Sequence, residues 1–359
     1  MSTTSPEAML VFVGTFAESL HVYRLDRRSG ALAPLHTTTG LHRPTFLALH
    51  PQLPVLYAVE RQAHEGATDL GAVTAFAFDR DGGRLDLLNR QSTHGIGPCY
   101  VSVHPSGRYV LVANYGSGSV VVLPVQPDGS LGEATDVVQH TGRGPDPQRQ
   151  DTPHAHCIAA DPSGTCVLAC DLGADRVMVY RLNATTGKLL PHDRPYAQGN
   201  SGAGPRHLAF HPNGQYVYVI NELDSTLTTY AYGAAQGISQ VVQTISTLPD
   251  EFVGDNSCAQ VMVAPGGRFV YGSNRGHDSL AIFASDPVTG RLRLVGHEPS
   301  RGQTPRNFNL DPTGTWLLAA NQLSNTIVPF RVDQDAGTLT ATTPVTEVPA
   351  PSCVIFSHG

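Results

Sequence analysis

The sequence predicts an all-β protein, a seven-bladed β-propeller built from four-stranded antiparallel blades. Three observations carry this prediction. A hairpin with a proline-centred turn recurs along the chain, further strand patterns follow each hairpin, and the two ends of the chain supply complementary parts of one more unit. Four strands repeated about every 50 residues are the signature of propeller blades. We therefore expect a single domain spanning residues 1–359.

The recurring hairpin is clearest in "RHLAFHPNGQYVYVIN" (206–221), where alternating apolar and polar residues flank a Pro-Asn-Gly turn. Such alternation around a tight turn is typical of two antiparallel strands. Six hairpins of this kind have their turn prolines at Pro51, Pro105, Pro162, Pro212, Pro265 and Pro312. Segments such as "SVVVLPVQPDGSL" follow each hairpin and predict a third strand, a turn and the start of a fourth strand.

The chain ends predict the seventh blade. Near the N-terminus, "MLVFVGTF" and "LHVYRLDRRSGAL" supply a second, a third and the beginning of a fourth strand, but no first strand. The C-terminal "APSCVIFSHG" supplies a first strand and then stops. A blade shared between the termini would close the ring and remove exposed sheet edges.

Composition limits the partners and the compartment. Charged residues make up 15% of the chain, the formal net charge is −7, and no basic run is present, so we expect no nucleic-acid partner. No apolar stretch approaches the roughly 20 residues of a membrane-spanning helix. The start "MSTTSPEAML" lacks the basic region of a signal peptide, so we expect a cytoplasmic protein. The six cysteines form no CxxC motif and are expected to be buried free thiols.

Two positions of the repeat are expected to meet at one mouth of the central channel. The first strand of each blade lines the channel, and an antiparallel hairpin brings its start next to the end of the second strand. The position six residues before each turn proline holds Thr45, Cys99, His156, Arg206, Ala259 and Arg306, with Ser352 as the equivalent in the shared blade. The position ten residues after each proline holds Arg61, Tyr115, Leu172, Glu222, Arg275 and Gln322.

These side chains suit an anionic substrate, because guanidinium groups bind carboxylate or phosphate in bidentate fashion. His156 and Glu222 are the evident proton-transfer groups, and the sequence leaves open which of them is the base. No GxSxG motif, phosphate-binding loop or dinucleotide fingerprint is present, so we expect attack by an activated water or a group of the substrate, without a covalent enzyme intermediate, and no cofactor. The alternative is a rim of solvated charges that form ordinary ion pairs.

The segment "RGPDPQRQDTPHAHC" (143–157) interrupts the strand pattern and is expected to form a lip that brings Arg149 towards the substrate. His154 and His156 are two residues apart, so on a strand they would point to the same side and could bind a metal. No third ligand has matching spacing, and we therefore expect no bound metal. His50, His104 and His211 precede turn prolines, recur with the repeat and are expected to be structural.

Several motifs resemble the seven-bladed propeller lactonase family, which includes 6-phosphogluconolactonases and carboxy-muconate cyclases. They are "RQDTPHAH", "GPRHLAFHPNGQYVYVINEL", "SNRGHDSLAIF" and "GQTPRNFNLDPTGTWLLAAN". The resemblance covers nearly the whole chain. It implies that His156, Arg206, Glu222 and Arg275 form the active site. It also supports Arg306 as a further anion contact.

The leading hypothesis is hydrolysis of 6-phospho-D-glucono-1,5-lactone or a similar anionic sugar lactone. His156, Glu222, Arg206 and Arg275 are the expected catalytic residues. The expected substrate-binding residues are Arg306, Arg149, His154, Arg61 and Gln322. A muconate-type cycloisomerase or dicarboxylate lactonase, and a propeller that only binds partners, remain alternatives. We expect a monomer or a weak homodimer.

Overall fold

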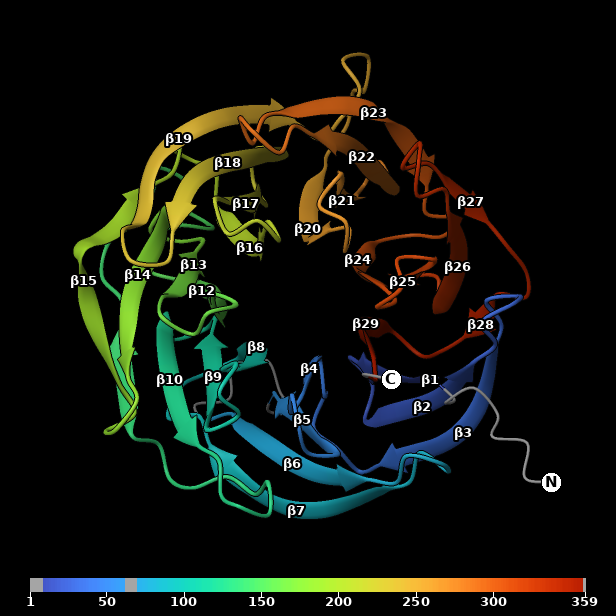
Figure 1. Cartoon of the computed structure of the whole chain (residues 1–359), viewed down its shortest axis with the longest axis horizontal. Coiled ribbons are helices and arrows are strands. Elements are labelled where there is room, and N and C mark those ends of the chain that lie inside the picture. The colour runs from blue at the N-terminus through green and yellow to red at the C-terminus, as the bar shows by residue number, and fades with distance from the viewer. Residues whose placement is uncertain (1–8, 62–69, 358–359) are drawn as a thin grey trace.

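The protein forms seven antiparallel sheets arranged in a ring around a central axis, as Figure 1 shows. The structure, a computed structural model, describes residues 9–61 and 70–357. Within these residues every regular element is a strand. The predicted seven-bladed propeller is therefore confirmed. The argument that the first residues lack a signal peptide falls largely outside the described residues.

The blades are numbered along the chain, and their strands run from the channel outwards. Blade 1 holds β29 (Pro351–Phe356), β1 (Met9–Thr15), β2 (Ser19–Leu25) and β3 (Leu32–Thr39). Blade 2 holds β4 (Phe46–Leu49), β5 (Val55–Glu60), β6 (Ala72–Phe78) and β7 (Leu85–Ser92). Blade 3 holds β8 (Pro98–Val103), β9 (Tyr109–Asn114), β10 (Ser119–Pro124) and β11 (Asp136–Gln139).

The other four blades follow the same order. Blade 4 holds β12 (Ala155–Ala160), β13 (Val167–Asp171), β14 (Arg176–Asn183) and β15 (Lys188–Gln198). Blade 5 holds β16 (Pro205–Phe210), β17 (Tyr216–Asn221), β18 (Thr226–Gly233) and β19 (Gly237–Ser246). Blade 6 holds β20 (Ser257–Val263), β21 (Phe269–Arg275), β22 (Ser279–Ser285) and β23 (Leu292–Pro299). Blade 7 holds β24 (Pro305–Leu310), β25 (Trp316–Asn321) and β26 (Thr326–Val332), with β27 (Leu339–Ala341) and β28 (Thr346–Glu347) sharing the fourth position.

The two ends of the chain close the ring as predicted. The C-terminal strand β29 is the channel strand of blade 1, and it pairs antiparallel with β1, which places Val354 opposite Val13. Every blade thus has a neighbour on both sides, and no blade leaves a face of its sheet uncovered (Figure 1).

The hydrophobic core lies between neighbouring blades. Alternate residues of one strand face opposite neighbours: Val11 and Val13 of β1 pack towards blade 7, whereas Leu10 and Phe12 pack towards blade 2. Because both faces are covered, the second strands are buried throughout, as the strand β17 illustrates. Side chains of a strand point alternately to its two faces, so this packing follows from the apolar strand pattern.

Histidines that precede the turn prolines link the blades on the side opposite the channel mouth. His50 donates from Nε2 to the carbonyl oxygen of Gly107 in the next blade at 2.9 Å. His104 and His211 make the equivalent bonds to Gly164 and Gly267 at 2.9 and 3.0 Å. The structural role predicted for these histidines is confirmed.

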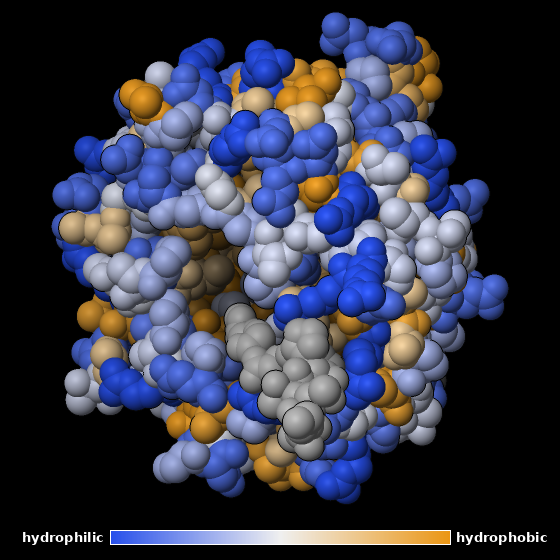
Figure 2. Space-filling view, turned by 45° about the vertical axis from the view of Figure 1, so that its right-hand side comes forward, coloured by the Kyte–Doolittle hydropathy of each residue, from blue (hydrophilic) through white to orange (hydrophobic). Residues whose placement is uncertain are grey.

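Two expectations about composition can be compared with the structure. All six cysteines are free and buried, as predicted. No helix within the described residues is long and apolar enough to cross a membrane. Figure 2 shows one side of the surface, where hydrophilic residues dominate and hydrophobic ones lie in small separate groups.

Candidate active site

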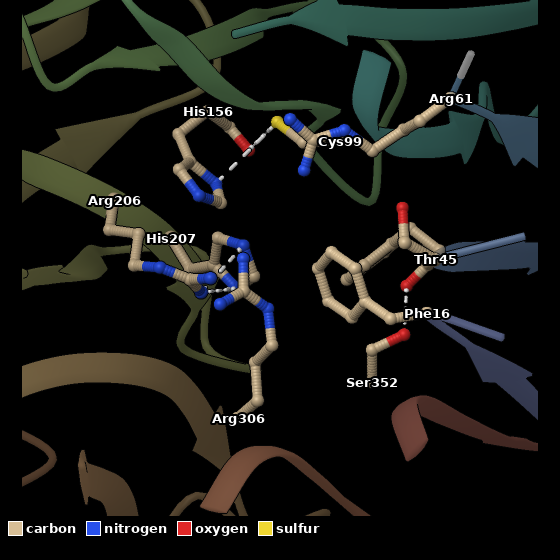
Figure 3. Close-up of a pocket in the computed structure, with 10 residues that line it drawn as sticks. Phe16, Thr45, Arg61, Cys99, His156, Arg206, His207, Arg306 and Ser352 are labelled. Atoms are coloured by element: carbon tan, nitrogen blue, oxygen red, sulfur yellow. Dashed lines mark hydrogen bonds between the residues drawn. The ribbon is translucent and has the colours of Figure 1, made fainter. Parts of the chain in front are cut away.

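A pocket at the channel mouth is lined by six of the seven side chains that share the first predicted position (Figure 3). These are Thr45, Cys99, His156, Arg206, Arg306 and Ser352. Phe16, Phe46, Arg61 and His207 complete the lining, and the empty space of the pocket, its open mouth included, is about 280 Å³. The repeat therefore located the residues that meet at this mouth.

A β-bulge repeated at the start of the channel strands directs these side chains into the pocket. The register of β16 against β17 shifts between Pro205 and His207, so Arg206 has no cross-strand partner. The same shift leaves Cys99, His156, Arg306 and Ser352 unpaired in their strands. A bulge bends the strand and re-aims the side chain of the extra residue. This local irregularity explains why one position of the repeat faces the channel in blade after blade.

Three arginines surround the carboxylate of Glu222 at the edge of this pocket. Oε2 of Glu222 accepts a hydrogen bond from Nε of Arg206 at 2.8 Å and forms an ion pair with Nη2 of Arg275 at 3.0 Å. Oε1 accepts a hydrogen bond from Nη2 of Arg149 at 2.6 Å. Burial alone would raise the pKa of Glu222, but the charges of Arg275 and Arg206 and the hydrogen bond from Arg149 outweigh it and hold the pKa far below its ordinary value. The carboxylate is therefore ionised at neutral pH, and both of its oxygens are paired with guanidinium groups.

Two buried imidazoles lie beside the arginines. The rings of His156 and His207 are 5.1 Å apart, and Nη1 of Arg206 donates to Nε2 of His207 at 3.1 Å. Because that nitrogen accepts, the proton of His207 lies on Nδ1, which donates to Oε1 of Gln260 at 2.5 Å. Burial, followed by the charge of Arg206, holds the pKa of both imidazoles well below the ordinary value. Both rings are therefore neutral near pH 7.

Arg306 is the cation that this network leaves without a counter-ion. Its guanidinium lies 4.8 Å from the centre of the Phe16 ring, and no carboxylate or hydrogen-bond acceptor among the described residues pairs with it. Arg61 is placed similarly, 5.9 Å from the same ring. Burial, followed by the charges of Arg206 and Arg275, lowers the pKa of Arg306 well below its ordinary value. A guanidinium nevertheless remains protonated in proteins, so the pocket holds uncompensated positive charge.

The cysteine in the pocket is a thiol rather than a nucleophile. Sγ of Cys99 donates to the backbone oxygen of His156 at 3.5 Å and lies 3.7 Å from Nδ1 of that residue. Burial raises the pKa of Cys99 to about 11, although nearby arginines act in the opposite direction. The thiolate, which is the nucleophilic form, is therefore scarce at neutral pH.

The segment 143–157 brings Arg149 to the mouth, where its half-exposed side chain binds Glu222 and donates to Tyr115 Oη at 3.3 Å. His154 stacks on the ring of Tyr115 and donates from Nδ1 to the backbone oxygen of that residue at 2.9 Å. Arg149, His154, Arg275 and Gln322 do not line the pocket itself, whereas Arg61 does. No group of three or more His, Cys, Asp or Glu side chains within residues 9–61 and 70–357 could hold a metal.

Comparison with known proteins agrees with this geometry. The family described as "Lactonase, 7-bladed beta-propeller" matches residues 10–356. The chain belongs to this lactonase family. It is 36% identical over 356 residues to a 6-phosphogluconolactonase from Bacillus subtilis, covering 97% of this chain and 98% of the relative. It is 33% identical over 342 residues to a 6-phosphogluconolactonase from Formosa agariphila, covering 92% of this chain and 94% of the relative.

A solved structure of a periplasmic gluconolactonase from Pseudomonas aeruginosa has a TM-score of 0.91 to this propeller lactonase at 32% identity. The match covers 98% of this chain and 99% of that one. The residues that the family resemblance singles out, namely His156, Arg206, Glu222 and Arg275, belong to one connected cluster in this lactonase.

Sequence reasoning missed three residues of the lactonase pocket, namely Phe16, Phe46 and His207. Phe16 is the equivalent of Glu222 in blade 1, because its N–H donates to Ala350 O just as that of Glu222 donates to Gly204 O. Blade 1 has no turn proline from which to count positions, so the repeat could not identify Phe16. His207 follows a bulged residue, and a bulge lets two successive side chains face the same way.

Proposed function

We propose that the protein is a lactonase that hydrolyses the ester of an anionic sugar lactone, and that 6-phospho-D-glucono-1,5-lactone is its substrate. The observation that carries this proposal is the unpaired guanidinium of Arg306 in the same pocket as the neutral imidazole of His156. A cation without a counter-ion favours a substrate that brings the negative charge. The names of the relatives support a sugar lactone as that substrate.

His156 is the base that activates water in this mechanism. Its ring is neutral near pH 7 and can accept a proton. An anion bound at Arg306 would cancel part of the positive field that lowers the pKa of His156, so the imidazole becomes a stronger base when the substrate is present. Glu222 is less suited to this task, because three arginines occupy its oxygens.

The proposed reaction adds one water across the ester bond. His156 takes a proton from the water, whose oxygen forms a bond to the lactone carbonyl carbon. The guanidinium group of Arg206 stabilises the negative charge on the carbonyl oxygen of the tetrahedral intermediate. The ring C–O bond then breaks, and the leaving oxygen takes the proton back from His156. The product is an open-chain acid, and neither a metal nor a covalent enzyme intermediate is needed.

Glu222 holds the cationic side of the pocket in place. By binding Arg206, Arg275 and Arg149 with one carboxylate, it allows three guanidinium groups to stand close together in a buried site. Burial, together with the charge of Arg275, lowers the pKa of Arg206 to about 10, so this group stays charged at neutral pH.

The test is acid release from freshly generated 6-phosphogluconolactone, followed with a pH indicator. We expect hydrolysis by the wild type well above the buffer rate and a loss of about 10²–10⁴-fold in His156→Ala, the usual range for removal of a general base. His104→Ala is the matched control, since His104 links blades far from the pocket. A wild-type rate equal to that of buffer would exclude this substrate.

A dicarboxylate such as a muconate is the second candidate, favoured by a specific observation. Two unpaired guanidinium groups, those of Arg61 and Arg306, lie near the same Phe16 ring and could each bind one carboxylate. Loss of the ultraviolet absorbance of a muconate on mixing with the protein would identify this activity. A propeller that only binds partners would show neither lactone hydrolysis nor loss of muconate absorbance.

A further inference from the structure

The equivalent positions around the channel mouth divide into an arc of basic residues, which Ala259 of blade 6 interrupts, and an uncharged arc. Blades 4, 5 and 7 contribute His156, Arg206 and Arg306. Blades 1, 2 and 3, which follow one another around the ring, contribute the uncharged residues Ser352, Thr45 and Cys99. A substrate that fills the pocket therefore meets Arg206 and Arg306 on one side and the hydroxyl groups of Thr45 and Ser352 on the other, with the guanidinium of Arg61 near Cys99 (Figure 3).

Thr45 carries an unused hydroxyl group in the uncharged arc. The residue is only 5% exposed, and its Oγ1 atom is buried without a hydrogen-bond partner. The same residue lines the pocket. A buried hydroxyl without a partner is unfavourable by roughly 1–3 kcal/mol, so in the working protein this atom is expected to bond to something that enters the pocket.

The neighbouring Ser352 complements Thr45. Its Oγ donates to the backbone oxygen of Thr45 at 3.0 Å and lies 3.3 Å from that of Gly14, so its proton is committed and its oxygen remains free to accept. The Thr45 hydroxyl can both donate and accept. In Figure 3 the two residues lie on the far side of the Phe16 ring from Arg206 and His207.

We propose that Thr45 and Ser352 form a subsite for the hydroxyl groups of the substrate and thereby select polyhydroxylated lactones. This inference rests on the proposed lactonase function and adds an orientation to it. The anionic group lies towards Arg306, and the sugar hydroxyls lie towards Thr45. The apolar ring of Phe16 separates the two regions.

The experiment compares the wild type with Thr45→Val, which removes the hydroxyl and keeps the shape of the side chain. For 6-phosphogluconolactone we expect KM to rise about tenfold with kcat nearly unchanged. For a γ-lactone that carries one carboxylate and no hydroxyl groups, we expect no change. Thr45→Ser should restore the wild-type KM.

Thr229→Val is the matched control. Its Oγ1 is also buried and without a partner, but it lies in β18, away from the pocket. This variant should match the wild type with both lactones. An unchanged KM in Thr45→Val, or an equal rise with both lactones, would overturn the proposed subsite.

Calorimetric binding of 6-phosphogluconate, a stable polyol anion, separates this inference from the proposed function. A protein that binds it, and binds it about tenfold more weakly after Thr45→Val, has the subsite even if it hydrolyses no lactone. Equal binding by both proteins would overturn the subsite while leaving the lactonase function intact. Absence of both binding and hydrolysis would overturn both.

Discussion

Nε of Arg206 donates to Oε2 of Glu222 at 2.8 Å, and this bond joins the start of the first strand of blade 5 to the end of its second strand. The side chains of both residues are less than 10% exposed. The same carboxylate also binds Arg275 from blade 6 and Arg149 from the segment 143–157. One carboxylate thus fixes three cations that come from three parts of the chain.

Glu222→Gln should strongly destabilise the protein, because it leaves buried guanidinium groups without their counter-charge. Breaking a buried pair in this way typically costs about 3–5 kcal/mol of unfolding free energy. Urea denaturation of the variant and the wild type measures this difference in unfolding free energy. The control is Glu298→Gln, which removes an exposed pair with Arg301 and should cost less than about 1 kcal/mol. If the two variants were equally stable, Glu222 would not act as the counter-ion.

The stability of the protein should fall as the pH falls, in two steps. The unfolded chain protonates His156 and His207 near the ordinary pKa of 6.5, whereas the folded chain keeps them neutral, so protons favour unfolding below that pH. Below the ordinary glutamate pKa of 4.5, Glu222 adds a second loss, since only the unfolded chain takes up that proton. Melting temperatures between pH 8 and pH 4 measure both steps. His156→Gln should reduce the first step, and Glu222→Gln should reduce the second.

The acid limb of kcat/KM should lie below pH 6.5. This limb reports the free enzyme, in which burial and the charge of Arg206 keep the pKa of His156 below its ordinary value. The activity is therefore expected to stay near its plateau on going from pH 8 to pH 6.5. The limb of kcat should lie at higher pH than that of kcat/KM, because the bound anion raises the pKa of the imidazole. A kcat/KM limb above pH 6.5 would argue against His156 as the base.

Arg306→Met should weaken substrate binding without weakening the fold. A charge-assisted hydrogen bond contributes about 1.5–3 kcal/mol, so KM for the phosphorylated lactone should rise roughly 10- to 100-fold, and that for unphosphorylated gluconolactone should rise less. The unfolding free energy should stay the same or increase, because Arg306 has no counter-ion among the described residues. Arg268→Met, on the opposite side of the hairpins, is the control for loss of an exposed arginine. Equal losses with both lactones would contradict an anion-binding role.

The repeat allowed the fold and the pocket position to be predicted, because a propeller uses the same geometry in every blade. The residues at that position differ from blade to blade, and this variation marked the site. The partners of Glu222 could not be predicted in the same way. Arg149 comes from an irregular segment, and whether Arg275 or Arg306 reaches the carboxylate depends on side-chain directions that the β-bulges determine.

The histidine that links neighbouring blades is missing from three of the six proline turns, since Asp161, Ala264 and Asp311 hold its position in blades 4, 6 and 7. At Ala264 a cavity lies beside the turn. Where His50, His104 and His211 stand in their blades, blade 6 has Ala264. Between blades 6 and 7 lies a cavity of about 200 Å³, lined among others by Ala264, Gly314 and Tyr271. Gly314 holds the place of Gly107, Gly164 and Gly267, and its backbone oxygen has no hydrogen bond from the described residues.

Ala264→His should therefore stabilise the protein. The new imidazole would fill part of the cavity and donate from Nε2 to the oxygen of Gly314, as His211 does to Gly267 at 3.0 Å. One added hydrogen bond is worth about 1 kcal/mol, and the melting temperature should rise by about one to two degrees with unchanged lactone hydrolysis. His211→Ala, the reverse change one junction away, should lower it by at least as much, since it leaves a buried carbonyl without its donor. A melting temperature of Ala264→His at or below that of the wild type would show that the junction between blades 6 and 7 does not accept a linking histidine.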